Sequence, residues 1–121
     1  MIDKHDFDDG NGLVDAHMHL NGGGWVADTA TVDDSAYVGK NAEVTGGSKV
    51  SGNAKVTGDA MVSGNAMIYG DAMVCGCAKV YGYAKVYGAS KVSGNAKVCG
   101  DAKVYGNSLV TGNDLIYGEV K

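Results

Sequence analysis

The chain lacks any hydrophobic run long enough to cross a membrane, although 45% of its 121 residues are hydrophobic. A membrane-spanning helix needs about 20 consecutive apolar residues. The start of the chain, Met1 to Asp6, is acidic and has no apolar stretch of the kind found in secretory signals. We therefore expect a protein without signal peptide or membrane contact, located in the cytoplasm or associated with a virion.

Arginine and proline are absent, and aromatic residues make up only 7% of the chain. Few aromatic residues and 20 glycines suit a thin core of small side chains. Residues 1–35 contain eight acids and one lysine, a net charge of −7, whereas residues 36–121 contain six acids and nine lysines, a net charge of +3. An acidic head followed by a mildly basic shaft argues against strong nucleic-acid binding and leaves a local polyanion site open.

A disulfide framework is also missing, because the chain has an odd number of cysteines, three. Cys75 and Cys77 fall on one side of the repeat described below, and Cys99 falls on another side. No pair is therefore positioned to form a disulfide. Free thiols indicate a reducing compartment.

What the chain has instead is a six-residue repeat without insertion or deletion. A valine or isoleucine recurs every six residues, sixteen times in a row, from Val26 to Ile116. Residues 54–59, which read Ala-Lys-Val-Thr-Gly-Asp, are a typical unit. A small residue stands four positions after each of the first fourteen of them, at Ala30, Ala36, Ala42, Ser48, Ala54, Ala60, Ala66, Ala72, Ala78, Ala84, Ser90, Ala96, Ala102 and Ser108, and only Asp114 and Val120 break the pattern.

This period fits a strand that alternates inward and outward for four residues and then turns for two. The valine and the small residue point inward, and the glycine that follows supplies the positive φ of a corner. Strands this short are stable only when they stack on the next units, so a parallel β-helix is the expected outcome.

Three hexads per coil would place residues 18 apart directly above one another, about 4.8 Å apart. Residues 25–121 then make about five coils, roughly 25 Å tall, and residues 1–24 form an irregular N-terminal cap. Asp114 stands at an inward position, where a charged side chain is costly. We therefore expect the last coil to be frayed.

The hexad resembles the hexapeptide-repeat, left-handed β-helix superfamily over residues 25–118. The resemblance implies an all-β fold, a single-stranded left-handed parallel β-helix or β-solenoid. It also implies a homotrimer, since the best-known members are trimeric acyltransferases. Residues 21–32 are similar to the start of phage and bacterial repeat proteins labelled as transferases or polymer-forming proteins, which implies a phage-related or accessory origin. Neither resemblance supplies an activity.

The outward positions form vertical columns that differ between the three sides. One side carries Tyr69, Tyr87 and Tyr105 in consecutive coils, with Lys85 and Lys103 on the same strands. These five residues are the candidate ligand-binding residues, because each tyrosine offers an apolar face and a hydroxyl to a sugar or a nucleobase. Mutual stacking of the tyrosines for stability, or a contact with another subunit, is the alternative that we favour.

Two further sets of outward residues encircle the shaft. Met61, Met67 and Met73 place one methionine on each side, and we consider them candidate oligomer contacts because exposed apolar rings favour association. A ring of lysines in the next hexads is explained by solubility. The lysines of this ring are Lys79, Lys85, Lys91, Lys97 and Lys103.

All three histidines, His5, His17 and His19, lie in the head. Residues 15–19, Asp-Ala-His-Met-His, resemble the Asp-x-His-x-His metal strand of amidohydrolases, in which alternation puts both imidazoles on one face. That family needs a much larger barrel and further ligands, so we expect no metal and no other cofactor. The three histidines are the candidates should a metal bind.

An acyltransferase of the resembled superfamily needs a general base, usually a histidine near a subunit junction, and commonly has a loop extruded from the helix. This chain has no insertion and no histidine after residue 19. The sequence therefore favours a non-enzymatic β-solenoid scaffold or binding module, such as a phage structural or accessory protein. Its expected partners are copies of itself, a polysaccharide or another protein.

Two alternatives stay open. One is a small acyltransferase whose base is His17 or His19 of a neighbouring subunit. The other is a carbohydrate- or nucleotide-binding protein that uses the tyrosine and lysine face.

Overall fold

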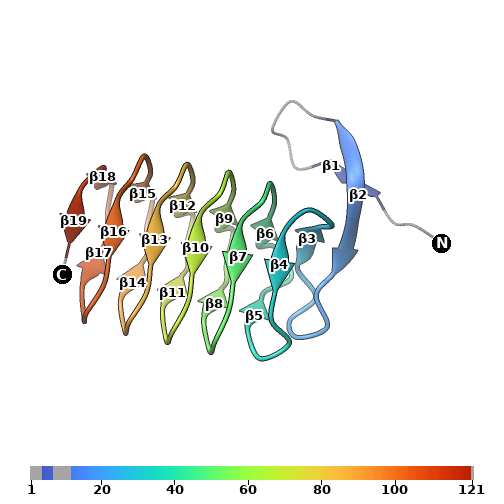
Figure 1. Ribbon diagram of the computed structural model, residues 1–121, viewed down its shortest axis with the longest axis horizontal. Coiled ribbons are helices and arrows are strands. Elements are labelled where there is room, and N and C mark those ends of the chain that lie inside the picture. Colours follow the sequence, from blue (N-terminus) through green and yellow to red (C-terminus); the bar gives the residue numbers. More distant parts are fainter. Residues whose placement is uncertain (1–3, 7–11, 121) are drawn as a thin grey trace.

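The computed structural model describes residues 4–6 and 12–120, which form an all-β rod without a helix in those ranges (Figure 1). Nothing among them is a helix long and apolar enough to span a membrane. The strands are β1 (Lys4–Asp6), β2 (Leu13–Met18), β3 (Trp25–Ala27), β4 (Thr31–Val32), β5 (Tyr37–Val38), β6 (Glu43–Val44), β7 (Lys49–Val50), β8 (Lys55–Val56), β9 (Met61–Val62), β10 (Met67–Ile68), β11 (Met73–Val74), β12 (Lys79–Val80), β13 (Lys85–Val86), β14 (Lys91–Val92), β15 (Lys97–Val98), β16 (Lys103–Val104), β17 (Leu109–Val110), β18 (Leu115–Ile116) and β19 (Glu119–Val120).

Every third strand joins the same sheet, so the rod has three flat sides. The sheet orders are β1-β2-β3-β6-β9-β12-β15-β18, β19-β16-β13-β10-β7-β4 and β17-β14-β11-β8-β5. From β3 onward all pairs are parallel and join residues 18 apart, as Val80 does with Val98, except that the last pair, β16 with β19, joins residues 16 apart. The predicted β-solenoid with three hexads per coil and about five coils is confirmed. In Figure 1 the chain descends along the near side, returns behind and advances from right to left, which is a left-handed winding.

The core contains only small and branched side chains, as the repeat requires. Each inward valine from Val38 to Val104, with Ile68 among them, is fully buried, and so are the inward alanines between them. Three serines replace alanine without leaving a buried polar group unpaired, because each hydroxyl donates to the carbonyl three residues earlier. These bonds are Ser48 to Thr45 at 2.7 Å, Ser90 to Tyr87 at 2.8 Å and Ser108 to Tyr105 at 2.7 Å.

Backbone hydrogen bonds connect each coil to the next one. In the corner that follows β12, for example, the N–H of Tyr81 donates to the carbonyl of Val98 at 2.9 Å, and the N–H of Tyr83 donates to that of Gly100 at 2.8 Å. Such bonds continue around the corners as well as along the strands, which keeps the coil cross-section constant. The shaft therefore offers regular outer faces and no extruded loop.

The last coil departs from the regular repeat, and the side chain of Asp114 is exposed there, as the sequence led us to expect. The N–H of Lys97 donates to the Asp114 carbonyl at 2.8 Å, and that of Lys103 donates to the Gly118 carbonyl at 3.0 Å, so backbone hydrogen bonds still connect this coil to the shaft. The register is nevertheless shifted, because β16 and β19 pair residues 16 apart, and Ile116 is only half-buried. The exposed carboxylate escapes the cost of burial.

The N-terminal end is covered by an antiparallel cap. Strand β2 pairs with β1 on one edge and with β3 on the other, and both pairs are antiparallel. The turn that follows β2 lies along the first coil, where the N–H of Val38 donates to Asn21 at 3.1 Å and Gly24 donates to Val38 at 2.9 Å. Figure 1 shows the β1–β2 hairpin standing at one end of the rod, opposite the C-terminus.

Candidate functional site

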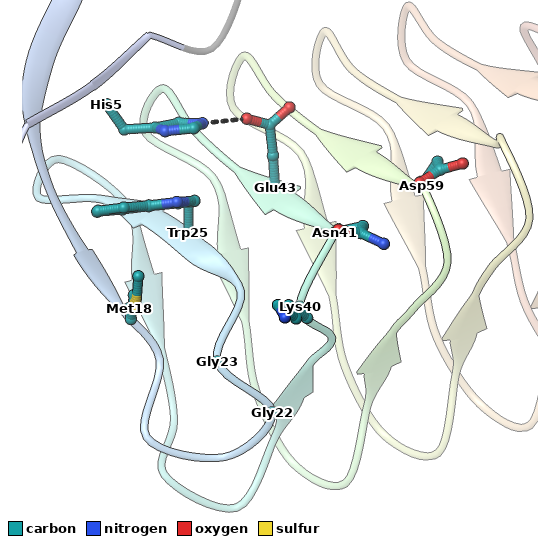
Figure 2. Close-up of a pocket in the computed structure, with 9 residues that line it drawn as sticks. All are labelled: His5, Met18, Gly22, Gly23, Trp25, Lys40, Asn41, Glu43 and Asp59. Carbon is teal, nitrogen blue, oxygen red and sulfur yellow. Dashed lines mark hydrogen bonds and ion pairs between the residues drawn. The ribbon is translucent and has the colours of Figure 1, made fainter.

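An open groove of about 670 Å³ lies where the cap meets the shaft, and Figure 2 shows its lining. Its volume falls in the range of small-molecule sites. Two segments of the cap and two corners of the shaft contribute to it. The lining residues are His5, Met18, Gly22, Gly23, Trp25, Lys40, Asn41, Glu43 and Asp59.

The groove exists because the cap chain can approach the first coil closely. A Cβ atom at Gly24 would lie 2.3 Å from the carbonyl oxygen of Gly39 and 2.4 Å from a methyl carbon of Val38. A side chain at position 24 would therefore push the cap away from the shaft. The glycine run at residues 22–24 sets the distance between the two walls of the groove.

His5 and Trp25 form an aromatic pair at one wall of this groove. Their rings are stacked, with centroids 4.6 Å apart and an angle of 11° between the planes. His5 also donates from Nε2 to Oε2 of Glu43 at 2.5 Å, which ties strand β1 to strand β6. His5, a residue of the cap, thus fixes the position of the Trp25 indole.

The other two histidines have separate partners. His17 is exposed, and its Nδ1 donates to Oδ1 of Asp28 at 2.8 Å. His19 is only 5% exposed, and its Nε2 donates to the Ala36 carbonyl at 2.8 Å. The buried bond of His19 closes part of the free edge of strand β5.

The candidate metal ligands His5, His17 and His19 are therefore held in three different places. Among the described residues, no group of three His, Cys, Asp or Glu side chains is arranged to hold a metal ion. Of the two candidate bases, His17 is open to solvent, whereas His19 is enclosed. An acceptor substrate could reach only His17 without displacement of the cap.

The tyrosine column is stacked ring on ring. Tyr69 and Tyr87 have centroids 4.8 Å apart and planes 1° apart, and Tyr87 and Tyr105 are 5.2 Å and 7° apart. Burial, followed by the neighbouring Tyr87, raises the pKa of Tyr69 above its ordinary value. Both faces of the central ring are covered by its neighbours, so a flat ligand cannot stack on it. What the column offers to a ligand is a row of ring edges and hydroxyls.

Lysines flank this column, as the sequence predicted. Lys85 and Lys103 are register partners in adjacent strands, and no ion pair involves either of them within the described chain. The structure therefore brings the five candidate ligand-binding residues together on one side of the rod. Whether they bind a ligand stays a prediction.

The candidate contact residues Met61, Met67 and Met73 are half-buried rather than fully exposed. Met61 is paired in register with Glu43 and Lys79, and Met67 is paired with Lys49 and Lys85. Long lysine stems next to a methionine cover apolar surface while the ammonium group stays in water. The role of the methionines as oligomer contacts stays a prediction.

No motif in the sequence points to the groove. Lys40, Asn41 and Asp59 stand at corner positions of the repeat. Two corner positions that are 18 residues apart, 41 and 59, could have been recognised as neighbours from the repeat. The approach of the cap to this corner depends on antiparallel pairing, which the repeat does not encode.

The comparison with known families gives one match. The family model described as the YdcK beta solenoid repeat matches residues 60–76. No curated protein and no solved structure matches the chain. Over these residues the chain is similar to a β-solenoid repeat protein, in agreement with the stacked coils.

Proposed function

We propose that this β-solenoid is a non-enzymatic scaffold that holds a binding surface at a fixed position on a rigid rod. The observation that carries the proposal is the regularity of the shaft. About five coils stack with parallel strands that pair residues 18 apart from β3 to β18, which gives a rod roughly 25 Å long at the ordinary strand spacing. Its outer faces repeat the same short strand and offer no extruded loop around which to shape a catalytic pocket.

The positions of the histidines also support a role without catalysis. His5 is held between the Trp25 ring and Glu43, and His19 is buried against a backbone carbonyl. A general base must reach the proton that it removes, either directly or through one water molecule. Neither of these two side chains is free to do so.

A direct test is an assay for acyl transfer from acetyl-CoA to a panel of amine and hydroxyl acceptors, read out as free thiol. We expect no release above the uncatalysed rate. Turnover at the usual enzyme rates, about 1 per second or faster, would refute the scaffold proposal.

The His17–Asp28 pair is the one observation that favours the acyltransferase alternative. A carboxylate that accepts from Nδ1 orients an imidazole so that Nε2 can act as a base, and His17 is open to solvent. If transfer occurs, it should be lost in His17→Ala and retained in His19→Asn, which keeps a side-chain amide donor. Transfer that survives in His17→Ala would exclude this base.

Self-association is part of the proposal, with a homotrimer as the favoured state. Three flat sides and the superfamily resemblance support it. Light scattering after size exclusion should give three times the 12.3 kDa chain mass. Replacement of Met61, Met67 and Met73 by threonine should lower that mass if the methionines form the contact. A monomer in the unmodified protein would contradict the oligomer.

A virion-associated role is the more specific form of the scaffold proposal. Its support is the similarity of residues 21–32 to repeat proteins of phages. Detection of the chain in purified particles by mass spectrometry would test it, and absence from them would leave an accessory role.

A further inference from the structure

The groove between cap and shaft presents one face of the Trp25 indole. Figure 2 shows His5 over one face of this ring, with Met18, Gly22, Gly23 and Lys40 on the opposite side. Because His5 already occupies the outer face, a ligand in the groove would meet the other one. The indole is half-buried and is the single tryptophan of the chain.

The Trp25 ring is held in place before any ligand arrives. The stack with His5 and the bond from His5 to Glu43 fix one side of the ring. Strand β3, which carries Trp25, is paired on both edges, with β2 and with β6. A preorganised aromatic face loses little conformational entropy on binding.

Polar groups line the shaft side of the groove. Asn41 and Asp59 occupy equivalent corners in successive coils, so they lie about one strand spacing apart, near 4.8 Å. Both are exposed, and the Asp59 side chain takes part in no ion pair within the described residues. An amide and a carboxylate side by side can accept from, and donate to, neighbouring hydroxyl groups.

The charge of the lining disfavours anionic ligands. One lysine, Lys40, faces the groove together with the two carboxylates Asp59 and Glu43. The carboxylates repel phosphate and carboxylate ligands. The head, with its net charge of −7 over residues 1–35, further disfavours anions.

We propose that this groove binds the ring of a neutral sugar. The apolar face of the pyranose would stack on the face of Trp25 opposite His5, beside Met18, while its hydroxyls hydrogen-bond to Asn41 and Asp59. The proposal rests on the scaffold function, to which it adds a site and a ligand class. It places binding at the cap, away from the tyrosine column.

The single indole N–H gives a direct probe of the site. We would follow its resonance by ¹H–¹⁵N NMR during titration with the methyl glycosides of glucose, galactose, mannose and N-acetylglucosamine. Glucuronate and ATP serve as the anionic comparison. We expect a saturable shift with at least one neutral glycoside, and weaker or no response to the anionic compounds.

Two groove variants and one matched control keep the indole and test its partners. Asp59→Ala and Asn41→Ala should each weaken binding about tenfold, the usual effect of losing one hydrogen bond to a polar or charged group. Asp101→Ala changes the same corner position of the repeat at an exposed site outside the groove, so binding should stay within about twofold.

Three outcomes would overturn the sugar site. They are the absence of any shift with the four glycosides, equal binding by Asp59→Ala and the unmodified protein, and tighter binding of an anionic compound than of every neutral one. If the second outcome came with loss of the shift in Tyr87→Phe, it would move the site to the tyrosine column. None of these results affects the scaffold proposal, which the acyl-transfer assay tests separately.

Discussion

The corner glycines allow the closest test of how the coils stack. Gly64 has a φ of +65°, and a Cβ atom there would lie 2.8 Å from the nitrogen and 3.0 Å from the oxygen of Gly82 in the next coil. Gly112 has nearly the same φ, +63°, but a Cβ there would meet nothing within 4 Å. The two positions share the backbone conformation and differ in the neighbour above them.

Replacement by alanine should therefore cost different amounts at the two sites. The left-handed conformation costs an alanine about 1–2 kcal/mol, and forcing a methyl group into packed backbone costs about 1–3 kcal/mol more. We expect Gly64→Ala to lower the free energy of unfolding by about 2–5 kcal/mol. Gly112→Ala should lower it by about 1–2 kcal/mol.

Urea unfolding followed by circular dichroism would measure both changes. Gly64→Asn separates the two causes, because asparagine tolerates a positive φ but still carries the Cβ atom. We expect Gly64→Asn to remain destabilised by about 1–3 kcal/mol. If Gly64→Asn were as stable as the unmodified protein, the contact between stacked corners would not limit this position, and the reasoning would be refuted.

Three further predictions concern the core, the tyrosine column and the cap. Ala72→Val should destabilise the rod by about 1–3 kcal/mol, since the narrow core has no room for a second branched side chain. Ile68→Val should cost only about 0.5–1.5 kcal/mol. Equal losses in urea unfolding would contradict the idea that the core is too narrow at position 72. The raised pKa of Tyr69 means that the folded state holds its proton more tightly, so the contribution of Tyr69 to the free energy of unfolding should be constant below about pH 10 and should fall above it. Tyr69→Phe should therefore reduce the loss of stability as the pH rises through this range, and an unchanged slope would argue against burial as the cause of the raised pKa. His5→Ala should speed hydrogen exchange in β1 and β2 but not in the shaft. His17→Ala removes only an exposed ion pair and should leave the exchange rates nearly unchanged. Equal effects of the two substitutions would show that His5 does not anchor the cap.

The repeat made the shaft predictable because the six-residue period and the small inward side chains both indicate a β-solenoid. Val56 and Ala60 can both point inward only if the chain turns between them, and the glycine at position 58 supplies that turn. The columns of tyrosines and lysines follow from the same register. The regular repeat ends at Asp114, whose side chain is exposed at an inward position of the last coil.

The candidate site was not predictable in the same way. The histidines drew attention as residue types, yet their roles depend on contacts with residues far away in the sequence, such as His5 with Glu43 and His19 with Ala36. The stacking of Tyr87 between two rings likewise changed what the column can bind. Side-chain chemistry gave the candidates, and three-dimensional contacts decided which surfaces they expose.

The sequence by itself determined the β-solenoid, its coil length of 18 residues and the composition of its three sides, because a strictly periodic chain repeats the same strand and corner in each hexad. Only the tertiary structure decided how the head closes the N-terminal end and where a groove forms. The head has no repeat, so its pairing with β3 and the first coil is fixed by long-range backbone hydrogen bonds and the His5–Trp25 stack. Such contacts depend on the whole fold and leave no local pattern in the chain.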